Sequence, residues 1–277
     1  MEYVLKYYKP TRLPLDLSPL SPEALEGKSA GEVAEMKVYA GKRMIELSRF
    51  FNVELRASGE DQHVKITIVG DLRNARRIGY EMKGGEMRVV GNGGIYLGER
   101  MKGGVITVEG DVDSWTGSGM RGGSITINGS AGDFLGASYR GSREGMSGGV
   151  IQVNGSIGCE GGAWMKGGLI HVKGSAGPFL GVHMQGGSIL VEGNCPGRVG
   201  AGMIGGRIAV LGKMLNLLPS FTVDSVRTHA DLGAVKVEGG FYMFTGDNNE
   251  QGQGRIYVSK DENPHFAWCE KYLGRWE

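Results

Sequence analysis

Four basic residues at equivalent positions are the first candidates for recognition chemistry. Lysine or arginine directly precedes a pair of glycines at four places, which we call the basic row: Lys83, Lys102, Arg121 and Lys166. Like charges stacked one strand spacing apart repel each other, so such a row belongs at an edge that faces solvent or an anionic partner. The sequence therefore predicts either a charged edge that blocks further strand pairing or a docking site for an acidic partner.

A second candidate is an insertion at 138–144, which carries Tyr139, Arg140 and Arg143. Tyrosine and arginine are enriched among the residues that anchor protein interfaces. In a repeat protein an insertion becomes a loop on one face, often the binding face. We expect these three side chains to project from the surface and to contact a partner, and an ordinary exposed loop is the alternative.

The residue types that could hold a metal ion are present but poorly spaced. Cys159, Cys195 and Cys269 lie far apart in the sequence, and no CxxC pair occurs. His171 and His183 fall at different positions of the repeat described below. Without a cluster of ligands we expect no zinc or iron–sulfur site, and the cysteines are expected to be free thiols in a reducing compartment.

Carboxylates that could serve glycoside chemistry have a simpler explanation. Asp111, Asp113 and Asp133 each follow a predicted strand, where a role in the turn accounts for them. The fragment Gly-Gln-Gly at 252–254 lacks the strand–loop–helix context of a nucleotide site. We therefore predict no catalytic, cofactor-binding or metal-binding residue in this chain.

A short sequence repeat positions all of these groups. Glycine pairs begin at positions 84, 103, 122, 148, 167, 186 and 205, so the steps are 19, 19, 26, 19, 19 and 19. Each unit continues as GG-x-I-x-V-x-G, and this alternation of apolar and polar residues predicts a strand. The inward positions form two columns: Met87, Ile106, Ile125, Ile151, Ile170, Ile189 and Ile208, and then Val89, Val108, Ile127, Val153, Val172, Val191 and Val210.

Like residues at like positions predict stacked parallel strands. A methionine stands two positions before each glycine pair, and we expect it to fill gaps in the core rather than to bind a soft metal: Met82, Met101, Met120, Met146, Met165, Met184 and Met203. Glycines recur where the chain must turn a corner: Gly98, Gly117, Gly136, Gly162, Gly181 and Gly200. The residues after each strand-ending glycine are expected to bond to their own turn: Asn92, Asp111, Ser130, Ser156, Ser175 and Asn194. The predicted fold is all-β, a right-handed single-stranded parallel β-helix of about seven to eight coils of about 19 residues.

Non-repeating segments flank the coils. The predicted organisation is an N-terminal arm and cap (1–63), the glycine-repeat β-helix (64–213), and a C-terminal cap and docking tail (214–277). In the first segment we expect an extended proline-rich arm, short helices at 21–27 and 29–36, a hairpin or helix at 39–53 and a polar loop at 57–63. In the last we expect a polar segment at 224–231, strands at 235–237, 241–244 and 256–258, and an aromatic docking tail with Phe266, Trp268, Tyr272 and Trp276.

The outward positions become apolar late in the repeat. Leu190, Ala209 and Leu211 need a cover, either from the chain's own C-terminal strands or from another subunit. The formal net charge of +1 gives no indication of nucleic-acid binding. No apolar run is long enough for a membrane span, and the N-terminus lacks the apolar core of a signal peptide, so a cytoplasmic location is expected.

The residues around the insertion resemble a known family. Ser138-Tyr139-Arg140-Gly141, followed by Arg143 and by Gly-Met-Ser-Gly-Gly at 145–149, resembles the C subunit of formylmethanofuran dehydrogenase. Gly79, Glu81-Met82 and the run Phe-Thr-Gly-Asp at 244–247 fit that family as well, and the resemblance covers nearly the whole chain. The glycine repeat alone is shared with the C-terminal domain of glutamate synthase.

The resemblance implies a non-catalytic scaffold subunit of a large archaeal complex. That complex uses reduced ferredoxin to convert CO2 and methanofuran to formylmethanofuran, the first step of methanogenesis from CO2. The implied partners are a molybdopterin or tungstopterin oxidoreductase subunit, its small pterin-domain subunit, an amidohydrolase-like subunit and ferredoxin-type subunits. They would hold the tungsten or molybdenum pterin, [4Fe–4S] clusters and a binuclear metal site, and no catalytic residue of the family maps onto this sequence.

Three alternatives stay open. The chain is also similar to the C subunit of a bacterial formyltransferase/hydrolase complex, which the sequence does not separate from the archaeal enzyme. A stand-alone glutamate synthase glycine-repeat subunit is opposed by the lack of Arg-Asn-Phe before 145–149. A self-assembling or ligand-binding β-solenoid is opposed by the atypical ends and by the interruption at residue 138.

Overall fold

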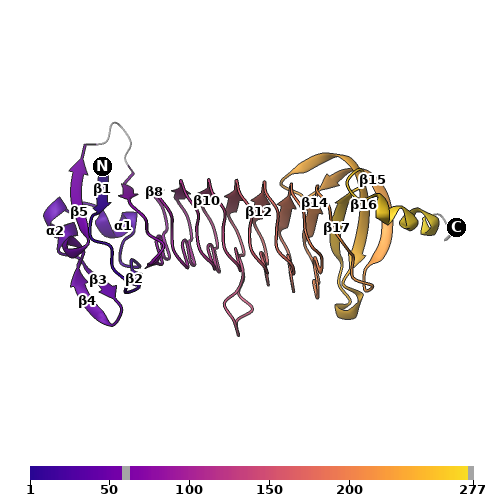
Figure 1. Cartoon of the computed structure of the whole chain (residues 1–277), viewed down its shortest axis with the longest axis horizontal. Helices are drawn as coiled ribbons and strands as arrows, with labels where there is room; N and C mark the ends of the chain where they lie inside the picture. The colour runs from indigo at the N-terminus through magenta and orange to yellow at the C-terminus, as the bar shows by residue number, and fades with distance from the viewer. Residues whose placement is uncertain (58–62, 274–277) are drawn as a thin grey trace.

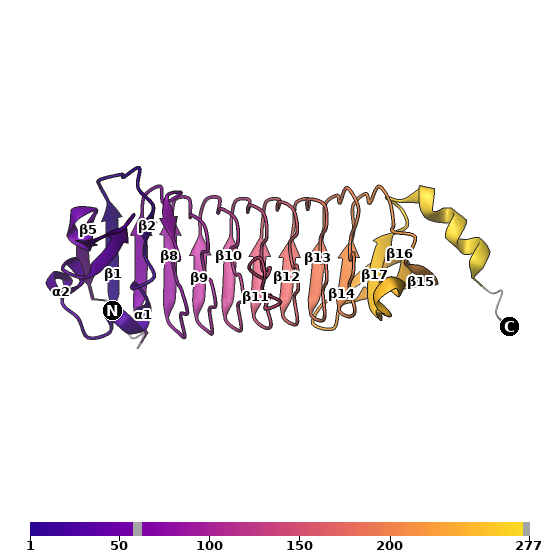
Figure 2. The same cartoon turned by 90° about the horizontal axis from the view of Figure 1, so that it is seen from below.

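The computed structural model describes residues 1–57 and 63–273. The chain is elongated, with a stack of repeats in the middle and less regular structure at either end (Figures 1 and 2). Strands within the described ranges form one mixed sheet of 13 strands, in the order β15-β16-β17-β14-β13-β12-β11-β10-β9-β8-β6-β1-β5, and a smaller sheet of four. The helices are short, so the predicted all-β class is confirmed.

The repeats build the centre of the large sheet. Their strands are β6 (Lys65–Val69), β8 (Glu86–Val90), β9 (Val105–Val108), β10 (Ser124–Ile127), β11 (Val150–Val153), β12 (Leu169–Val172), β13 (Ser188–Val191) and β14 (Arg207–Val210). Each strand pairs in parallel with the next, and equivalent residues of successive repeats lie side by side, as Ile106 and Ile125 do. Isolated parallel bridges, such as Val112 to Ala131, join several neighbouring repeats at a second place in the unit.

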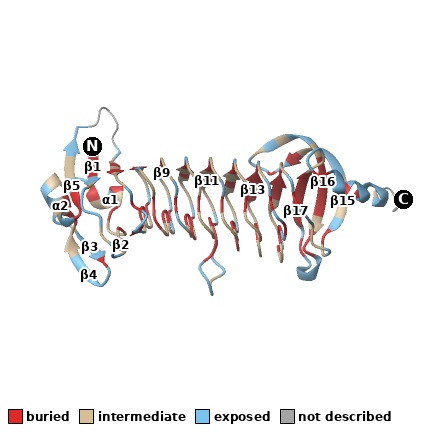
Figure 3. Cartoon of the chain, viewed as in Figure 1, coloured by how far each residue is buried: buried red, intermediate tan, exposed pale blue. Residues whose placement is uncertain are grey.

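The inside of the stack is a continuous apolar core. All the side chains of the isoleucine, valine and methionine columns are fully buried, as predicted. Buried residues recur along the whole stack and continue into both flanking segments (Figure 3). Each repeat therefore buries its apolar side against its neighbours, which is how a repeat protein obtains its stability.

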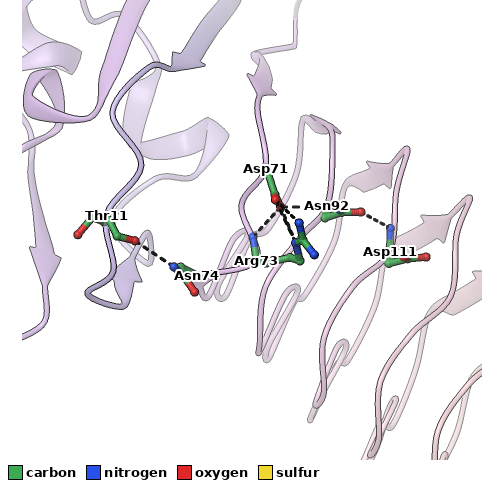
Figure 4. Close-up of polar contacts among 6 residues, drawn as sticks. All are labelled: Thr11, Asp71, Arg73, Asn74, Asn92 and Asp111. Carbon is green, nitrogen blue, oxygen red and sulfur yellow. Dashed lines mark hydrogen bonds and ion pairs between the residues drawn. The ribbon is translucent and has the colours of Figure 1, made fainter.

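Polar residues after each strand form a ladder between repeats, which corrects the prediction that they bond to their own turns. The N–H of Asp111 donates to Asn92 Oδ1 at 2.9 Å, and the N–H of Ser130 donates to Asp111 Oδ1 at 2.8 Å. The same bond recurs at Ser156, Ser175, Asn194 and Lys213. Figure 4 shows the start of the ladder, where Asn92 Nδ2 also donates to Asp71 Oδ1 at 3.4 Å. Rungs about 4.8 Å apart bring the next N–H within reach of a short side chain.

The N-terminal segment joins the stack instead of lying on it as an extended arm. Strand β1 (Glu2–Tyr7), which we had not predicted, pairs in parallel with β6 and antiparallel with β5 (Phe51–Arg56). The small sheet contains β2 (Leu15–Asp16), β3 (Lys37–Ala40), β4 (Arg43–Glu46) and β7 (Ala75–Arg76). In Figure 4, Asn74 next to β7 donates to the carbonyl of Thr11 at 2.9 Å, which ties this segment to the first repeat.

Both predicted N-terminal helices are confirmed. Helix α1 (Pro22–Leu25) begins after Ser21, whose hydroxyl accepts the N–H of Ala24. Helix α2 (Ala30–Ala34) has a capping box formed by Ser29 and Glu32. The hairpin of β3 and β4, followed by the 3-10 turn η1 (Leu47–Arg49), confirms the hairpin alternative for 39–53. Most of the predicted polar loop at 57–63 lies outside the described residues.

The C-terminal segment adds three strands. Strand β17 (Gly254–Ser259) continues the stack by pairing in parallel with β14, and it pairs antiparallel with β16 (Lys236–Gly246). The two strands predicted at 235–237 and 241–244 are thus one strand. The polar segment at 224–231 was not predicted as a strand, but it is β15 (Thr222–Asp231), an edge strand on β16 that is largely open to solvent. The 3-10 helix η2 (Asn248–Glu250) lies between β16 and β17, and the 3-10 helix η3 (Pro264–Tyr272) follows β17.

The C-terminal strands cover the late apolar positions. Leu190 and Ala209 are buried in a second cluster with Ala230, Leu232, Phe241, Met243 and Tyr257, and Leu211 packs against it. Of the two covers considered from the sequence, the chain supplies its own. In the aromatic tail Phe266 is buried, whereas Trp268 and Tyr272 are 46% and 55% exposed, and Trp276 lies outside the described residues. In the part of the chain that the structure describes, no helix combines the length and apolar character that crossing a bilayer requires.

Candidate interaction site at the insertion loop

The corners of three successive repeats each present an aromatic residue. Tyr96, Trp115 and Phe134 stand two positions before a corner glycine and have φ values of 62°, 58° and 64°. Because the same left-handed backbone recurs at each rung, their rings stack, with centroids 5.6 Å apart for Tyr96 and Trp115 and 4.4 Å apart for Trp115 and Phe134. We call these three residues the aromatic row. This row was not predicted from the sequence, although its members recur with the same period as the glycine pairs.

The insertion at 138–144 follows the aromatic row and protrudes from the stack in Figure 1. The ring of Tyr139, whose side chain is 57% exposed, lies 6.2 Å from those of Tyr96 and Trp115. Arg140 and Arg143, also exposed, lie over aromatic rings, 5.4 Å from the centroid of Phe134 and 5.2 Å from that of Trp164. These cation–π contacts hold the two exposed arginines against the surface of the stack, and their contact with a partner stays a prediction.

The basic row is exposed but partly neutralised. Lys102 Nζ lies 3.0 Å from Glu81 Oε2, and Lys166 Nζ lies 2.8 Å from Glu144 Oε1 of the insertion. The hydrogen bonds from the two lysines hold the pKa of Glu81 and the pKa of Glu144 below the ordinary glutamate value. Alternating charges reduce the repulsion that stacked lysines alone would suffer. Within residues 1–57 and 63–273, Lys83 and Arg121 have no ion-pair partner.

A polar cleft of about 250 Å3 lies between the insertion loop and the edge of the stack. Its lining includes Arg100, Gly119, Arg121, Tyr139, Ser142 and Glu144. The cleft brings together two residues singled out from the sequence, Tyr139 and Arg121, and Lys166 adjoins it through Glu144. Lys83 lies elsewhere, beside helix α1, where the carboxylate of Glu23 accepts its backbone N–H. The arrangement offers guanidinium and hydroxyl groups in a recess, which suits the binding of an anionic group.

The other candidates for chemistry have structural roles. Asp113 accepts the N–H of Ser114, and Asp133 accepts the N–H of Cys159 at 2.7 Å in the next repeat. His171 bonds to Glu192 at 2.7 Å, and the ring of His183 stacks on Trp164 with a centroid distance of 4.4 Å.

The three cysteines are free thiols. Burial raises the pKa of Cys195 to about 12 and the pKa of Cys269 to about 11. Thiols with such pKa values carry little thiolate at neutral pH and are poor nucleophiles and metal ligands. Among the described residues, no three histidine, cysteine or acidic side chains are grouped as a metal site would require.

No family model matches this chain, but known proteins are similar to it in sequence or in structure. The chain is 40% identical over 97 residues to the C subunit of tungsten-containing formylmethanofuran dehydrogenase 2 from Methanothermobacter wolfeii, a match that covers 35% of this chain and 36% of the relative. It is 37% identical over 96 residues to the C subunit of molybdenum-containing formylmethanofuran dehydrogenase 1 from Methanosarcina barkeri, covering 35% and 32%. The chain thus spans about a third of the length of the curated relatives it matches.

One similar solved structure extends the comparison to nearly the full length. It is the crystal structure of the formyltransferase/hydrolase complex (FhcABCD) from Methylorubrum extorquens in complex with methylofuran. A chain of that complex is 28% identical, with a TM-score of 0.80, and the match covers 92% of this chain and 99% of the other. The resemblance to the C subunit of formylmethanofuran dehydrogenase expected from the sequence is confirmed by these relatives.

Proposed function

We propose that this chain is the C subunit of a formylmethanofuran dehydrogenase-type complex and that it serves as a scaffold without a reaction of its own. The match of its whole structure to a chain of a multi-subunit formyl-transfer complex, at a TM-score of 0.80, is the observation that carries this proposal. The names of the curated relatives support the same assignment. The reaction of the complex would be reduction of CO2 and attachment of the formyl group to methanofuran.

The architecture suits a scaffold. We interpret the stack as a right-handed single-stranded parallel β-helix, in which each coil contacts only its neighbours and the whole presents a long, stiff surface. Side chains of the two inward columns and of the methionines fill its interior. The polar and aromatic groups available for recognition therefore lie outside, at the corners and on the insertion loop, where they can meet other proteins.

The proposed partners are a molybdopterin or tungstopterin oxidoreductase subunit with its small pterin-domain subunit, an amidohydrolase-like subunit and ferredoxin-type subunits. The pterin-bound metal, the [4Fe–4S] clusters and the binuclear metal site are assigned to those partners. The donors in this chain do not fit such groups. Cys195 and Cys269 are each buried, and their pKa values are raised. Asp111 accepts a hydrogen bond in the ladder, and Glu144 forms an ion pair with Lys166.

A second candidate is the C subunit of a formyltransferase/hydrolase complex. The observation in its favour is the coverage of 92% and 99% by the solved chain from that complex, compared with about a third for the dehydrogenase relatives. The scaffold role is the same in both cases. Tungsten or molybdenum in the purified complex, measured by elemental analysis, would favour the dehydrogenase, and their absence together with a retained amidohydrolase-like subunit would favour the second candidate.

The test is co-purification of the tagged full chain from its native cells, followed by mass spectrometry. We expect a pterin oxidoreductase subunit and an amidohydrolase-like subunit in stoichiometric amounts. Shortening the insertion at 138–144 to the corner of a neighbouring repeat should leave circular dichroism unchanged and reduce the retained partners, whereas Lys173→Ala, outside the insertion and the cleft, should not. A chain that purifies alone, or that turns over a substrate alone, would overturn the proposal.

A further inference from the structure

In the column of residues directly before the core methionines, Gly119 and Gly145 carry no side chain, and both line the cleft beneath the insertion loop. Most residues of this column adopt a left-handed backbone, and the position holds side chains in Arg100, Trp164 and His183, with φ values of 57°, 59° and 55°. Gly119 occupies the same position with a φ of 62°. A Cβ at Gly119 would meet no atom closer than 3.5 Å, so the space above it is open. The insertion loop walls this space with Tyr139 and Glu144.

The negative charges that line the cleft are already committed. Glu99 Oε2 lies 2.8 Å from the guanidinium of Arg77, which also pairs with Asp16 at 2.9 Å, and Glu144 is paired with Lys166. Outside the cleft, Glu81 is shared between Lys102 at 3.0 Å and Arg100 at 3.6 Å.

The lining holds two arginines, Arg100 and Arg121, and two glutamates whose charges are paired with basic residues outside the lining. Arg121 in the lining, and Arg140 and Arg143 on the loop, form no ion pair with any described residue. The cleft offers the unpaired guanidinium of Arg121 and the guanidinium of Arg100, which is held by Glu81. The hydroxyls of Tyr139 and Ser142 add two hydrogen-bond donors. Such a set of donors is complementary to a carboxylate.

We propose that this cleft receives an aspartate or glutamate side chain from an acidic segment of a partner protein. The inference rests on the proposed scaffold function and specifies the chemistry of one docking point. The cleft of about 250 Å3 accommodates a side chain rather than a domain. Its rim is formed by the exposed Tyr139, packed on the aromatic row, and rigid aromatic and arginine side chains around a recess are typical of the centre of an interface.

Two variants address the cleft by different means. Arg121→Glu reverses the charge of the unpaired guanidinium. Gly119→Asn fills the recess without altering any charge, and asparagine tolerates the left-handed backbone that this position requires. Lys173→Glu is the matched control, because Lys173 is an exposed residue of another repeat that follows β12 and does not line the cleft.

The first assay measures binding of a fluorescein-labelled (Asp-Ser)5 peptide to the full chain by anisotropy at low salt, with (Asn-Ser)5 as the neutral comparison. We expect the acidic peptide to bind and the neutral peptide not to bind. Each cleft variant should weaken binding of the acidic peptide about tenfold, and the control Lys173→Glu should change it less than about twofold. No binding of the acidic peptide, or equal losses in Arg121→Glu and Lys173→Glu, would overturn the inference. Unchanged thermal unfolding of the variants would show that they are folded.

The second assay places the same variants in the tagged full chain and measures partner retention during a salt wash. We expect Arg121→Glu and Gly119→Asn to release a partner at lower salt than the wild type does, because screening adds to the loss of the docking contact. Retention equal to that of the wild type in both variants would overturn the docking point and leave the scaffold function intact. A wild-type chain that retains no partner would instead overturn the scaffold function.

Discussion

Replacing the corner glycine Gly117 with alanine should destabilise the stack by about 2–5 kcal/mol, the sum of two costs that the structure separates. Gly117 has a φ of 70°, and a residue with a Cβ pays about 1–2 kcal/mol for that left-handed backbone. The added Cβ would also overlap Cδ1 of Ile151, which lies two repeats further along the chain. Ile151 is fully buried, so its displacement adds about 1–3 kcal/mol of overpacking.

Two matched variants isolate these costs. Gly119 is in the same repeat with a φ of 62°, but a Cβ there would meet only Glu144 O at 3.5 Å and Arg100 Cγ at 3.6 Å. Gly119→Ala should therefore cost only the backbone strain, about 1–2 kcal/mol. Ile151→Val removes the overlapping Cδ1 atom, so the cost of Gly117→Ala should fall to a similar value in that background. The expected coupling between positions 117 and 151 is about 1–3 kcal/mol.

The measurement is urea denaturation, monitored by circular dichroism. It compares the wild type, Gly117→Ala, Ile151→Val, the double variant and Gly119→Ala. Variants should share one m-value, since a change in m would indicate that the repeats no longer unfold together. The reasoning is refuted if Gly117→Ala costs no more than Gly119→Ala. It is also refuted if Ile151→Val leaves the cost of Gly117→Ala unchanged, because the overlap would then contribute nothing.

Three further predictions concern single side chains. Asp111→Ala should lower the unfolding free energy by about 0.5–1.5 kcal/mol, because the N–H of Ser130 loses its acceptor. Asp111→Asn keeps an acceptor and should therefore cost less. Thermal denaturation of the two variants makes the comparison. Burial alone would raise the pKa of Asp247, but hydrogen bonds from the N–H groups of Gly202 and Asn249 and from Ser220 outweigh burial and lower it. The resulting stability is present above the unfolded pKa of about 3.9 and is lost as pH falls through the lower folded value, so Asp247→Asn should flatten the acid limb of stability measured against pH; an unchanged limb would contradict this. Iodoacetamide at pH 8 should modify the partly exposed Cys159 faster than the buried Cys195, because the pKa of Cys195 is raised to about 12. Peptide mass spectrometry measures the two rates of labelling. Faster labelling of Cys195 would contradict the prediction and indicate that the core opens there.

The repeat itself was predictable because it is local. A glycine pair, an isoleucine and a valine recur at fixed spacing, and the burial of a side chain such as Ile125 depends on the same few residues in every unit. The capping residues Ser21 and Ser29 were predictable for the same reason, since a cap is decided within one turn of helix. The basic row and the insertion loop were also identified as surface features from the period alone, because an insertion cannot enter a filled core.

Contacts between distant residues were decided only in three dimensions. Strand β1 forms because it completes the edge of β6, which lies far along the chain, and β15 forms on β16 although its sequence is polar. The partners of Tyr139 and Arg121 likewise depended on the stack, which places equivalent positions of successive repeats on adjacent rungs. The period, the core and the exposed rows could be predicted from the sequence, because they follow from side-chain type at each position of one unit. The tertiary structure decided the ladders, the aromatic row and the cleft, because each of these requires two or more units to be stacked before its atoms meet.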